Sequence, residues 1–461
     1  MSTGDLLRRA SYGATSPVVG QRGARTRQAI VDAALQLFAE RGFHATLVDD
    51  IANAVGISRA ALYQYFESKE QLFVELMHES GAALLRVVRR LGPLGPTAAG
   101  YENLHWWLGE WAWVYDKYST MFVQWAHVDS PGAPLRPLIV QFLDAYAQRM
   151  AERMVASGVE GLDPEAAAMV LLAVVNRTNY YRHTSTVRGL SDEEVLDTLA
   201  TVAQLVLFPS TPAEVIVTHG PSGPGRLRST PLVVGSSRGG AGAGRLERFA
   251  AMSERVQGTV RQLLEAGARV FAANSFHVTS VDDVVTEAGL GRGTFYKYFD
   301  DKLDLLVTLA EECAGRLRGL TDAFTGLPAG PERPAALRAW LVEFVQFHRR
   351  YAGVFRVWTE QEPRDPILQA MGRGAADTIL EAFDEVLGRV PRPYGFCLPA
   401  GSLLLLALLE RLPDQVLGTR HDTDPTELAE LLAITIERGF LNGDTAVISR
   451  APRRRARTVK R

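Results

Sequence analysis

Apolar residues recur at spacings of three and four along most of the chain, which is the period of an amphipathic helix. In the segment 30–38, for example, Ile30, Leu37 and Phe38 fall on one face together with two alanines. Strand-like alternation is scarce, and the short run EVIV at 214–217 is the one possible strand. The pattern therefore predicts an all-α protein.

The same pattern occurs twice. Residues 43–69 and 276–302 align without a gap at an offset of 233 positions, with 12 identities in 27 positions. The offset also aligns an aromatic segment that follows each copy, and the register slips beyond about residue 130. A repeat of this kind predicts two tandem modules, each with a small head and a larger helical body.

The composition between the copies differs from that of the modules. Residues 209–244 are rich in glycine, serine and proline, which is typical of a flexible linker. We therefore expect a disordered N-terminus (1–21), a first head (22–75), a first effector and dimerisation body (76–208), the linker (209–244), a second head (245–308), a second body (309–445) and a basic disordered tail (446–461).

Within each head, the residues favour a helix, a tight turn at glycine and a second short helix. In the first copy a helix ends at Gly42, Thr46 and Asp49 are suited to cap the next helix, Gly56 turns the chain, and Ser58 caps the short helix 59–65. This is the helix-turn-helix arrangement, whose second helix enters the major groove of DNA.

The outer face of that second helix carries side chains that can read or hold DNA. Arginine can bind guanine, glutamine can bind adenine, and tyrosine or lysine can contact phosphates. Phe66 and Phe299 are expected to pack the heads instead. The candidate DNA-binding residues are Thr46, Ser58, Arg59, Ala60, Tyr63, Gln64, Tyr65 and Lys69 in the first head, and Thr279, Arg292, Gly293, Thr294, Tyr296, Lys297, Tyr298 and Lys302 in the second.

The pattern T-x-x-x-D-I-A-x-x-x-G-I-S-x-x-x-L-Y-x-Y-F-x-S-K-E-x-L at 46–72 resembles the DNA-binding domain of the tetracycline-repressor (TetR) family. The second copy, 279–305, fits with departures at Gly291, Asp301 and Leu303. The resemblance implies a transcriptional regulator, usually a repressor, whose helical bodies dimerise and whose small effector releases DNA. It places the dimer interface at 164–181 and 191–208, and at 399–411 and 425–440.

An aromatic stripe follows each head at helical spacing, on one helix or on two helices in line. Such a stripe either fills the core of a bundle or lines a pocket for an apolar or aromatic effector. Asn176 and Asn179 are further polar candidates. The candidate effector-binding residues are Trp107, Trp111, Tyr115, Tyr118 and Trp125 in the first copy, and Trp340, Phe344, His348, Tyr351 and Trp358 in the second.

Composition and charge add limits. The net charge of the 461 residues is −2, and seven of the basic groups lie in 450–461, so the rest of the chain is acidic. That tail is suited to nonspecific attraction to phosphates, or only to solubility. The two cysteines, the N-terminal sequence and the longest apolar run, ten residues, favour a cytoplasmic protein without a membrane span. We expect no catalytic residue, metal or cofactor, because catalytic and metal-binding motifs are lacking.

Two assemblies remain open from the sequence. In the first, one chain acts alone, with its two modules paired internally on an operator with unlike half-sites. A linker of roughly 36 residues spans about 30 Å on average, against about 34 Å between half-sites one turn apart. In the second, tandem chains form a homodimer with four heads that bridges DNA sites. An activator and a ligand-independent DNA binder are further alternatives to an effector-released repressor.

Overall fold

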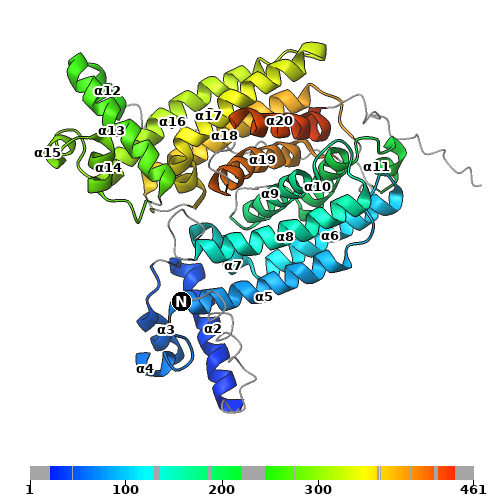
Figure 1. Cartoon of the computed structure of the whole chain (residues 1–461), viewed down its shortest axis with the longest axis horizontal. Helices are drawn as coiled ribbons and strands as arrows, with labels where there is room; N and C mark the ends of the chain where they lie inside the picture. Colours follow the sequence, from blue (N-terminus) through cyan, green and yellow to red (C-terminus); the bar gives the residue numbers. More distant parts are fainter. Residues whose placement is uncertain are drawn as a thin grey trace, which may run out of the picture. The chain divides into compact units, whose positions relative to one another are not determined.

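The computed structural model describes residues 21–43, 45–128, 135–184, 189–219, 244–274, 276–360, 363, 365–393, 396–419 and 424–441. All regular elements in these ranges are helices, so the all-α prediction is confirmed for the described chain (Figure 1). The chain divides into two compact units, which are described separately. One consists of residues 1–90 and 110–143, and the other of residues 91–109 and 144–461.

The first unit begins with the first head and continues into part of the first body. Helices α2 and α3 contact each other, and α7 contacts both α2 and α5. Helix α6 ends in this unit, and α8 begins in it. Its helices are α2 (Gln21–Arg41), α3 (Val48–Val55), α4 (Arg59–Leu62), α5 (Lys69–Arg90) and α7 (Ser119–Val128), together with residues 110–117 of α6 (Ala98–Lys117) and 136–143 of α8 (Arg136–Ser157).

The second unit contains the rest of the first body together with the described part of the second module. From the first module it contains the remainder of α6 and α8, together with α9 (Pro164–His183), α10 (Asp192–Leu207) and α11 (Ala213–His219). Those of the second module are α12 (Gly244–Ala250), α13 (Glu254–Ala273), α14 (Val281–Ala288), α15 (Arg292–Phe295), α16 (Lys302–Thr325), the 3₁₀ turn η2 (Gly330–Glu332), α17 (Arg333–Glu360), α18 (Pro366–Gly388), α19 (Leu398–Thr419), α20 (Pro425–Ile436) and the π-helical turn η3 (Glu437–Leu441).

Local capping explains where the helices of this unit begin. Helix α10 opens on a reciprocal capping box, in which the Glu194 amide donates to the Ser191 hydroxyl (3.2 Å) and the Ser191 amide donates to the Glu194 carboxylate (2.8 Å). Helices α9, α18 and α20 each open on an aspartate cap followed by proline, whose fixed φ suits the first helical position.

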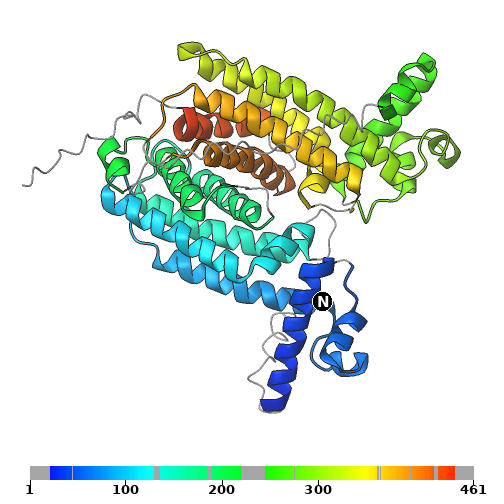
Figure 2. The ribbon, with the colours of Figure 1, turned by 180° about the vertical axis from the view of Figure 1, so that it is seen from behind.

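The repeat register returns in these helices. The caps Ser191 and Asp424 lie 233 positions apart, the same offset as in the heads. The slip expected beyond residue 130 is therefore local, and α10 corresponds to α20 and η3 at the original offset. In this unit α9 lies along α19, and α10 contacts both α19 and η3; both views show the green and brown helices side by side (Figure 1, Figure 2).

The first part of the expected linker is structured. The run 214–217 is not a strand, because it lies within helix α11. Helix α11 is anchored by Ile216, whose side chain is buried against Leu205 of α10. The remainder of the linker from 220 to 243, the N-terminal residues 1–20 and the basic tail lie outside the described residues.

Both bodies bend at equivalent tyrosines. Helix α6 gives way to α7 at Tyr118, and α17 has a non-helical residue at Tyr351 (φ −104°, ψ 18°), 233 positions further on. The hydroxyl of each tyrosine donates to a glutamate, Glu79 at 3.0 Å and Glu312 at 2.6 Å. These glutamates are also 233 positions apart, so the bend and its hydrogen bond are properties of the repeated module.

Candidate nucleic-acid interface

The turn of each helix-turn-helix forms at the glycine that the sequence indicates. Helix α3 ends at Gly56 (φ +72°) and α14 ends at Gly289 (φ +64°), a left-handed conformation that other residues adopt at a cost. Helix α4 then opens at Ser58, whose hydroxyl accepts the Ala61 amide at 3.1 Å. The second head has Gly291 at this position, so α15 opens without a side-chain cap.

The predicted caps of α3 and α14 are wrong by one residue. Thr46 and Thr279 are buried, and the Thr46 hydroxyl donates to the Gly42 carbonyl at 2.8 Å. Helix α3 instead begins after Leu47, whose amide donates to Asp50 (3.0 Å). Because a buried threonine side chain has no access to a phosphate, both threonines stabilise the heads and leave the set of proposed DNA contacts.

In the second head, the cap is a full capping box. The Ser280 hydroxyl accepts the Asp283 amide at 3.2 Å, and the Ser280 amide donates to the Asp283 carboxylate at 2.7 Å. The Ser280 hydroxyl also donates to this carboxylate at 2.7 Å, and this hydrogen bond, followed by that from the Ser280 amide, holds the pKa of Asp283 below its usual range. The carboxylate therefore stays charged at the positive end of the α14 dipole.

The short helices α4 and α15 bury one side and expose the other. Leu62 and Phe66 are buried in the first head, and Phe295 and Phe299 in the second, so the expectation that Phe66 and Phe299 pack the heads is confirmed. The outer residues are exposed in both heads, with the exceptions of Tyr65, Thr294 and Tyr298, which are half-buried. The exposed set is Ser58, Arg59, Ala60, Tyr63, Gln64, Arg292, Gly293, Tyr296 and Lys297.

An arginine at the centre of each exposed face is held in the same way. Arg59 donates to the Asp49 carboxylate at 2.9 Å and to the Tyr63 hydroxyl at 3.2 Å. Arg292 repeats this with Asp282 (3.2 Å) and Tyr296 (3.4 Å). The aspartate partners were not predicted from the sequence, although both members of each pair are identical at the offset of 233.

This arrangement prepares the arginine for a contact outside the protein. The guanidinium of Arg59 lies over the Tyr63 ring, 5.6 Å from its centroid, and more than half of the side chain is exposed. Hydrogen bonding to Tyr63 and the charge of Asp49 raise the pKa of Arg59, so the group is a permanent cation. A restrained, exposed guanidinium is suited to a base edge or a phosphate.

The lysines that open the next helices have a structural task. The Lys69 ammonium donates to the carbonyls of Phe43 (2.9 Å) and Thr46 (3.0 Å). Lys302 makes the same two contacts in the second head, both at 2.7 Å. Partial burial lowers the pKa of both lysines. They tie the loop before α3 or α14 to the next helix, and a phosphate contact remains a prediction for them.

Comparison with known proteins matches both heads. The model of the family described as bacterial regulatory proteins, tetR family, matches residues 30–76 and 263–309. Each match covers the helix-turn-helix of one head, so the two heads are similar to the DNA-binding domain of this family.

Relatives support this assignment over the length of a head. The chain is 48% identical over 58 residues to the HTH-type transcriptional repressor KstR2 of Rhodococcus jostii, which is 13% of this chain and 28% of that protein. It is 43% identical over 56 residues to the HTH-type transcriptional regulator AcrR of Shigella flexneri, covering 12% and 26% of the two chains. The matched segment thus spans about a quarter of each relative.

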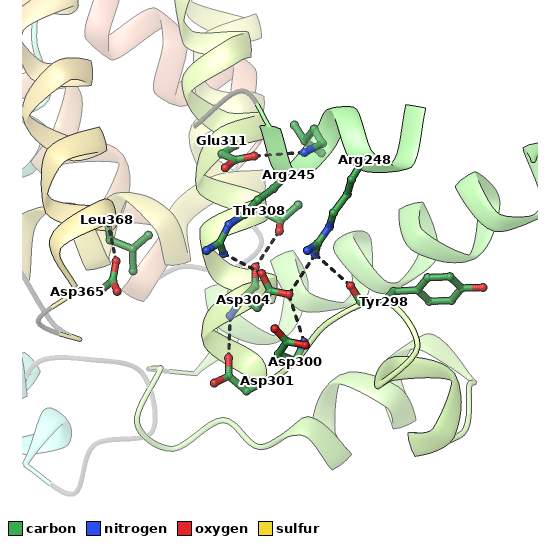
Figure 3. Close-up of polar contacts among 11 residues, drawn as sticks. Arg245, Arg248, Tyr298, Asp300, Asp301, Asp304, Thr308, Glu311, Asp365 and Leu368 are labelled. Atoms are coloured by element: carbon green, nitrogen blue, oxygen red, sulfur yellow. Dashed lines mark hydrogen bonds and ion pairs between the residues drawn. The ribbon is translucent and has the colours of Figure 1, made fainter. Parts of the chain in front are cut away.

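The described part of the second head also contains a short helix, α12, before α13. Asp304 of α16 accepts hydrogen bonds from Arg245 (2.8 Å) and Arg248 (3.1 Å), and Figure 3 shows both arginines directed onto this carboxylate. Arg248 also donates to the Tyr298 carbonyl at 3.0 Å, while the Tyr298 ring is directed away from the carboxylates (Figure 3). Helix α12 is therefore tied to the second head by charge as well as by the buried ring of Phe249.

The aromatic stripe is mostly buried in both bodies. In the first, Tyr115 stacks between Trp111 (5.7 Å) and Phe122 (4.7 Å), and Trp107 is buried. These contacts are those of a core, and the Trp125 side chain lies outside the described residues. Asn179 is also buried and donates to the Val175 carbonyl of its own helix.

In the second body the stripe includes a buried histidine. Trp340 stacks on Phe344, and its indole N–H donates to the Leu320 carbonyl at 2.9 Å. His348 stacks on Phe355, with ring centroids 4.8 Å apart, and burial lowers the pKa of His348 to about 4. Trp358 is half-buried. His348 is therefore a neutral, polar member of an otherwise apolar stripe.

In the part of the chain that the structure covers, no group of three or more histidine, cysteine or acidic side chains is arranged to hold a metal ion. Among the helices described, none is both long and apolar enough to cross a membrane.

Proposed function

We propose that the protein is a DNA-binding transcriptional repressor whose two unlike TetR-type heads bind one operator. The observation that carries this proposal is the arginine held by an aspartate and a tyrosine on the exposed face of α4, repeated on α15. A second helix that exposes a restrained guanidinium is suited to reading the major groove. The names of the relatives, which include repressors, favour repression.

The two faces differ at the positions around the arginine. The first head presents Ala60 and Gln64 where the second presents Gly293 and Lys297. Glutamine is suited to adenine, whereas lysine is suited to guanine or phosphate. We therefore expect an operator with dissimilar half-sites.

The two modules of one chain pair through their last helices. Helices α9 and α10 of the first module contact α19 and η3 of the second within one compact unit. This is the pairing that the family resemblance implies between two subunits. The alternative, a homodimer of tandem chains with four heads, requires twice the mass of one chain.

A small apolar or aromatic effector is proposed to release the DNA. The aromatic stripe of the second body supports this proposal, because the neutral imidazole of His348 stacks on the half-buried ring of Phe355, which in turn contacts the half-buried ring of Trp358. A neutral imidazole can donate and accept one hydrogen bond each, which suits a planar ligand with a polar edge. In the first body the stripe is filled by stacked rings, so it contributes less to such a site.

The experiment is selection of bound DNA from a random pool by the full chain, followed by binding of variants to the selected site. Arg59→Ala and Arg292→Ala should each cost about 1–3 kcal/mol on that site and relax discrimination in one half-site. Arg338→Ala, an exposed arginine on α17, is the matched control and should bind as the wild type does. Equal losses for Arg59→Ala on selected and random DNA would contradict the assigned role.

A further inference from the structure

The two modules contact each other at positions that are equivalent in the repeat. Arg177 of α9 and Glu410 of α19 lie 233 positions apart, and their side chains form an ion pair with 3.7 Å between Nη2 and Oε1. A residue that meets its own repeat equivalent lies on the pseudo-twofold axis that relates the modules. Arg177 and Glu410 therefore mark this axis, and both side chains are 8% exposed.

A second equivalent pair lies on the same axis. Val206 of α10 and Gly439 of η3 are also 233 positions apart. A Cβ atom built on Gly439 would lie 2.9 Å from Cγ2 of Val206 and 3.0 Å from Cγ1 of Val202. The valine thus occupies the space that a side chain at 439 would need.

Next to this pair, the two modules contribute different residues at equivalent positions of the interface. Arg438 crosses to the first module and donates to the carbonyls of Glu160 (2.6 Å) and Val206 (3.2 Å). Its repeat equivalent is Leu205, which packs on Ile216 instead. Charge, size and polarity therefore all differ between equivalent positions.

We propose that the unlike pairs Arg177–Glu410 and Val206–Gly439 make this interface selective for one module of each kind. Two first modules would bring Arg177 against a second arginine and Val206 against a second valine. Two second modules would bring Glu410 against a second glutamate and leave a void at Gly439. Buried like charges and overfilled or empty space are costly, so pairing of identical modules is disfavoured.

This selectivity has a use during synthesis. The first module is complete before the second has been made, and it exposes the apolar faces of α9 and α10 in the meantime. First modules of neighbouring chains would meet with arginine against arginine. The interface thus favours pairing of the first module with a second module over pairing with another first module.

The inference rests on the proposed pairing of modules, and its test uses the full chain without DNA. Glu410→Arg creates the arginine pair of two first modules, and Arg177→Glu creates the glutamate pair of two second modules. Each should lower the thermal unfolding midpoint by about 5 °C or more. Arg177→Glu combined with Glu410→Arg restores an unlike pair and should recover at least half of that loss.

The pair of unlike size, Val206 and Gly439, is tested in the same way. Gly439→Val reproduces the valine pair of two first modules and should also lower the midpoint. Combining it with Val206→Gly exchanges the large and small residues and should recover part of the loss.

The matched control is an ion pair within the second module. Arg338 of α17 and Glu430 of α20 lie 2.7 Å apart, and both are exposed. Glu430→Arg should shift the midpoint by less than about 2 °C, because exposed ion pairs contribute little.

Each possible outcome of these measurements either supports or overturns the proposed selectivity. Single variants as stable as the wild type, or a charge exchange no more stable than the worse single variant, would overturn the proposal. If a single variant does not fold, the charge exchange decides: folded protein at the wild-type mass supports selectivity, and its failure overturns it. A failure of the proposed DNA binding would leave these midpoints unchanged, so the two proposals fail independently.

Discussion

Single residues in this protein owe their properties to partners that are distant in sequence. His348 is surrounded by aromatic rings and lies near the charges of Asp414, Arg356 and Arg177. Burial is the largest cause of its low pKa, and the basic groups contribute in the same direction. The pKa of the buried Glu410 carboxyl is raised for the same physical reason, despite the opposing charge of Arg177.

The low pKa of His348 predicts a specific loss of stability in mild acid. The folded state keeps the ring neutral down to about pH 4, whereas the unfolded chain protonates it below about pH 6.5. The free energy of unfolding therefore falls as the pH falls through this window, by about 2 kcal/mol between pH 7 and pH 5. Urea unfolding at several pH values measures the loss.

The matched variants separate this histidine from the other titrating groups. His348→Phe should lose less stability than the wild type between pH 7 and pH 5. His78→Gln, at an exposed histidine, should keep the full wild-type decline. An unchanged decline in His348→Phe would show that the ring is not the source.

Residues with local tasks were predictable from the sequence, and residues with distant partners were not. Gly56 and the Ser58 cap depend only on their neighbours in the chain. Asp49 was predicted to cap a helix because it lies near a helix start. Its carboxylate instead accepts a hydrogen bond from Arg59, which is ten positions further along the chain. Thr46 was misassigned because its burial, which turns the hydroxyl inward, depends on tertiary contacts.

At the scale of elements, composition alone did not predict which segments are helical, because a single buried side chain can hold a short helix in place. The linker prediction averaged over 36 residues and missed helix α11, because its first residues hold one apolar side chain that packs on α10. The aromatic spacing correctly allowed two helices in line, and α6 and α7 are two such helices. What spacing could not supply was the glutamate that each bending tyrosine binds.

Helix α12 gives a test at this scale. Asp304 is buried and accepts from both Arg245 and Arg248, so Asp304→Asn should weaken the attachment of α12 by about 1–3 kcal/mol. Hydrogen exchange of the amides in 246–250 should then be about tenfold faster or more.

The control for this change is Asp301, whose carboxylate accepts from the Asp304 amide at 2.8 Å and caps α16. Asp301→Asn should leave exchange in α12 close to that of the wild type. Unchanged exchange in Asp304→Asn would mean that the other contacts of α12, such as the buried Phe249 ring and the hydrogen bond from Arg248 to the Tyr298 carbonyl, hold it in place without Asp304.

At the scale of the whole molecule, the compact units do not follow the repeat. Helices α9 and α10 come from the first module, yet they belong to the unit that contains the described second module. The repeat was evident from the sequence, and the resemblance indicated which helices would pair. The individual residues that meet across the pairing were not predicted, because they lie more than 200 positions apart.

This pairing predicts a single-chain particle. The apolar faces of α9 and α10 are already covered by α19 and η3 of the same unit, so the protein should have a mass near 50.5 kDa in solution. Light scattering at several concentrations measures it. A concentration-independent mass near twice that value would favour the four-headed homodimer.

The axis residues also bear on how such a protein can change over generations. In a dimer of identical subunits, one codon change alters both sides of the axis at once, so complementary partners cannot arise there stepwise. Fusion of the two halves into one gene removes that constraint, because Arg177 and Glu410 are encoded separately. It also fixes the ratio of the two halves at one to one, whatever the level of expression.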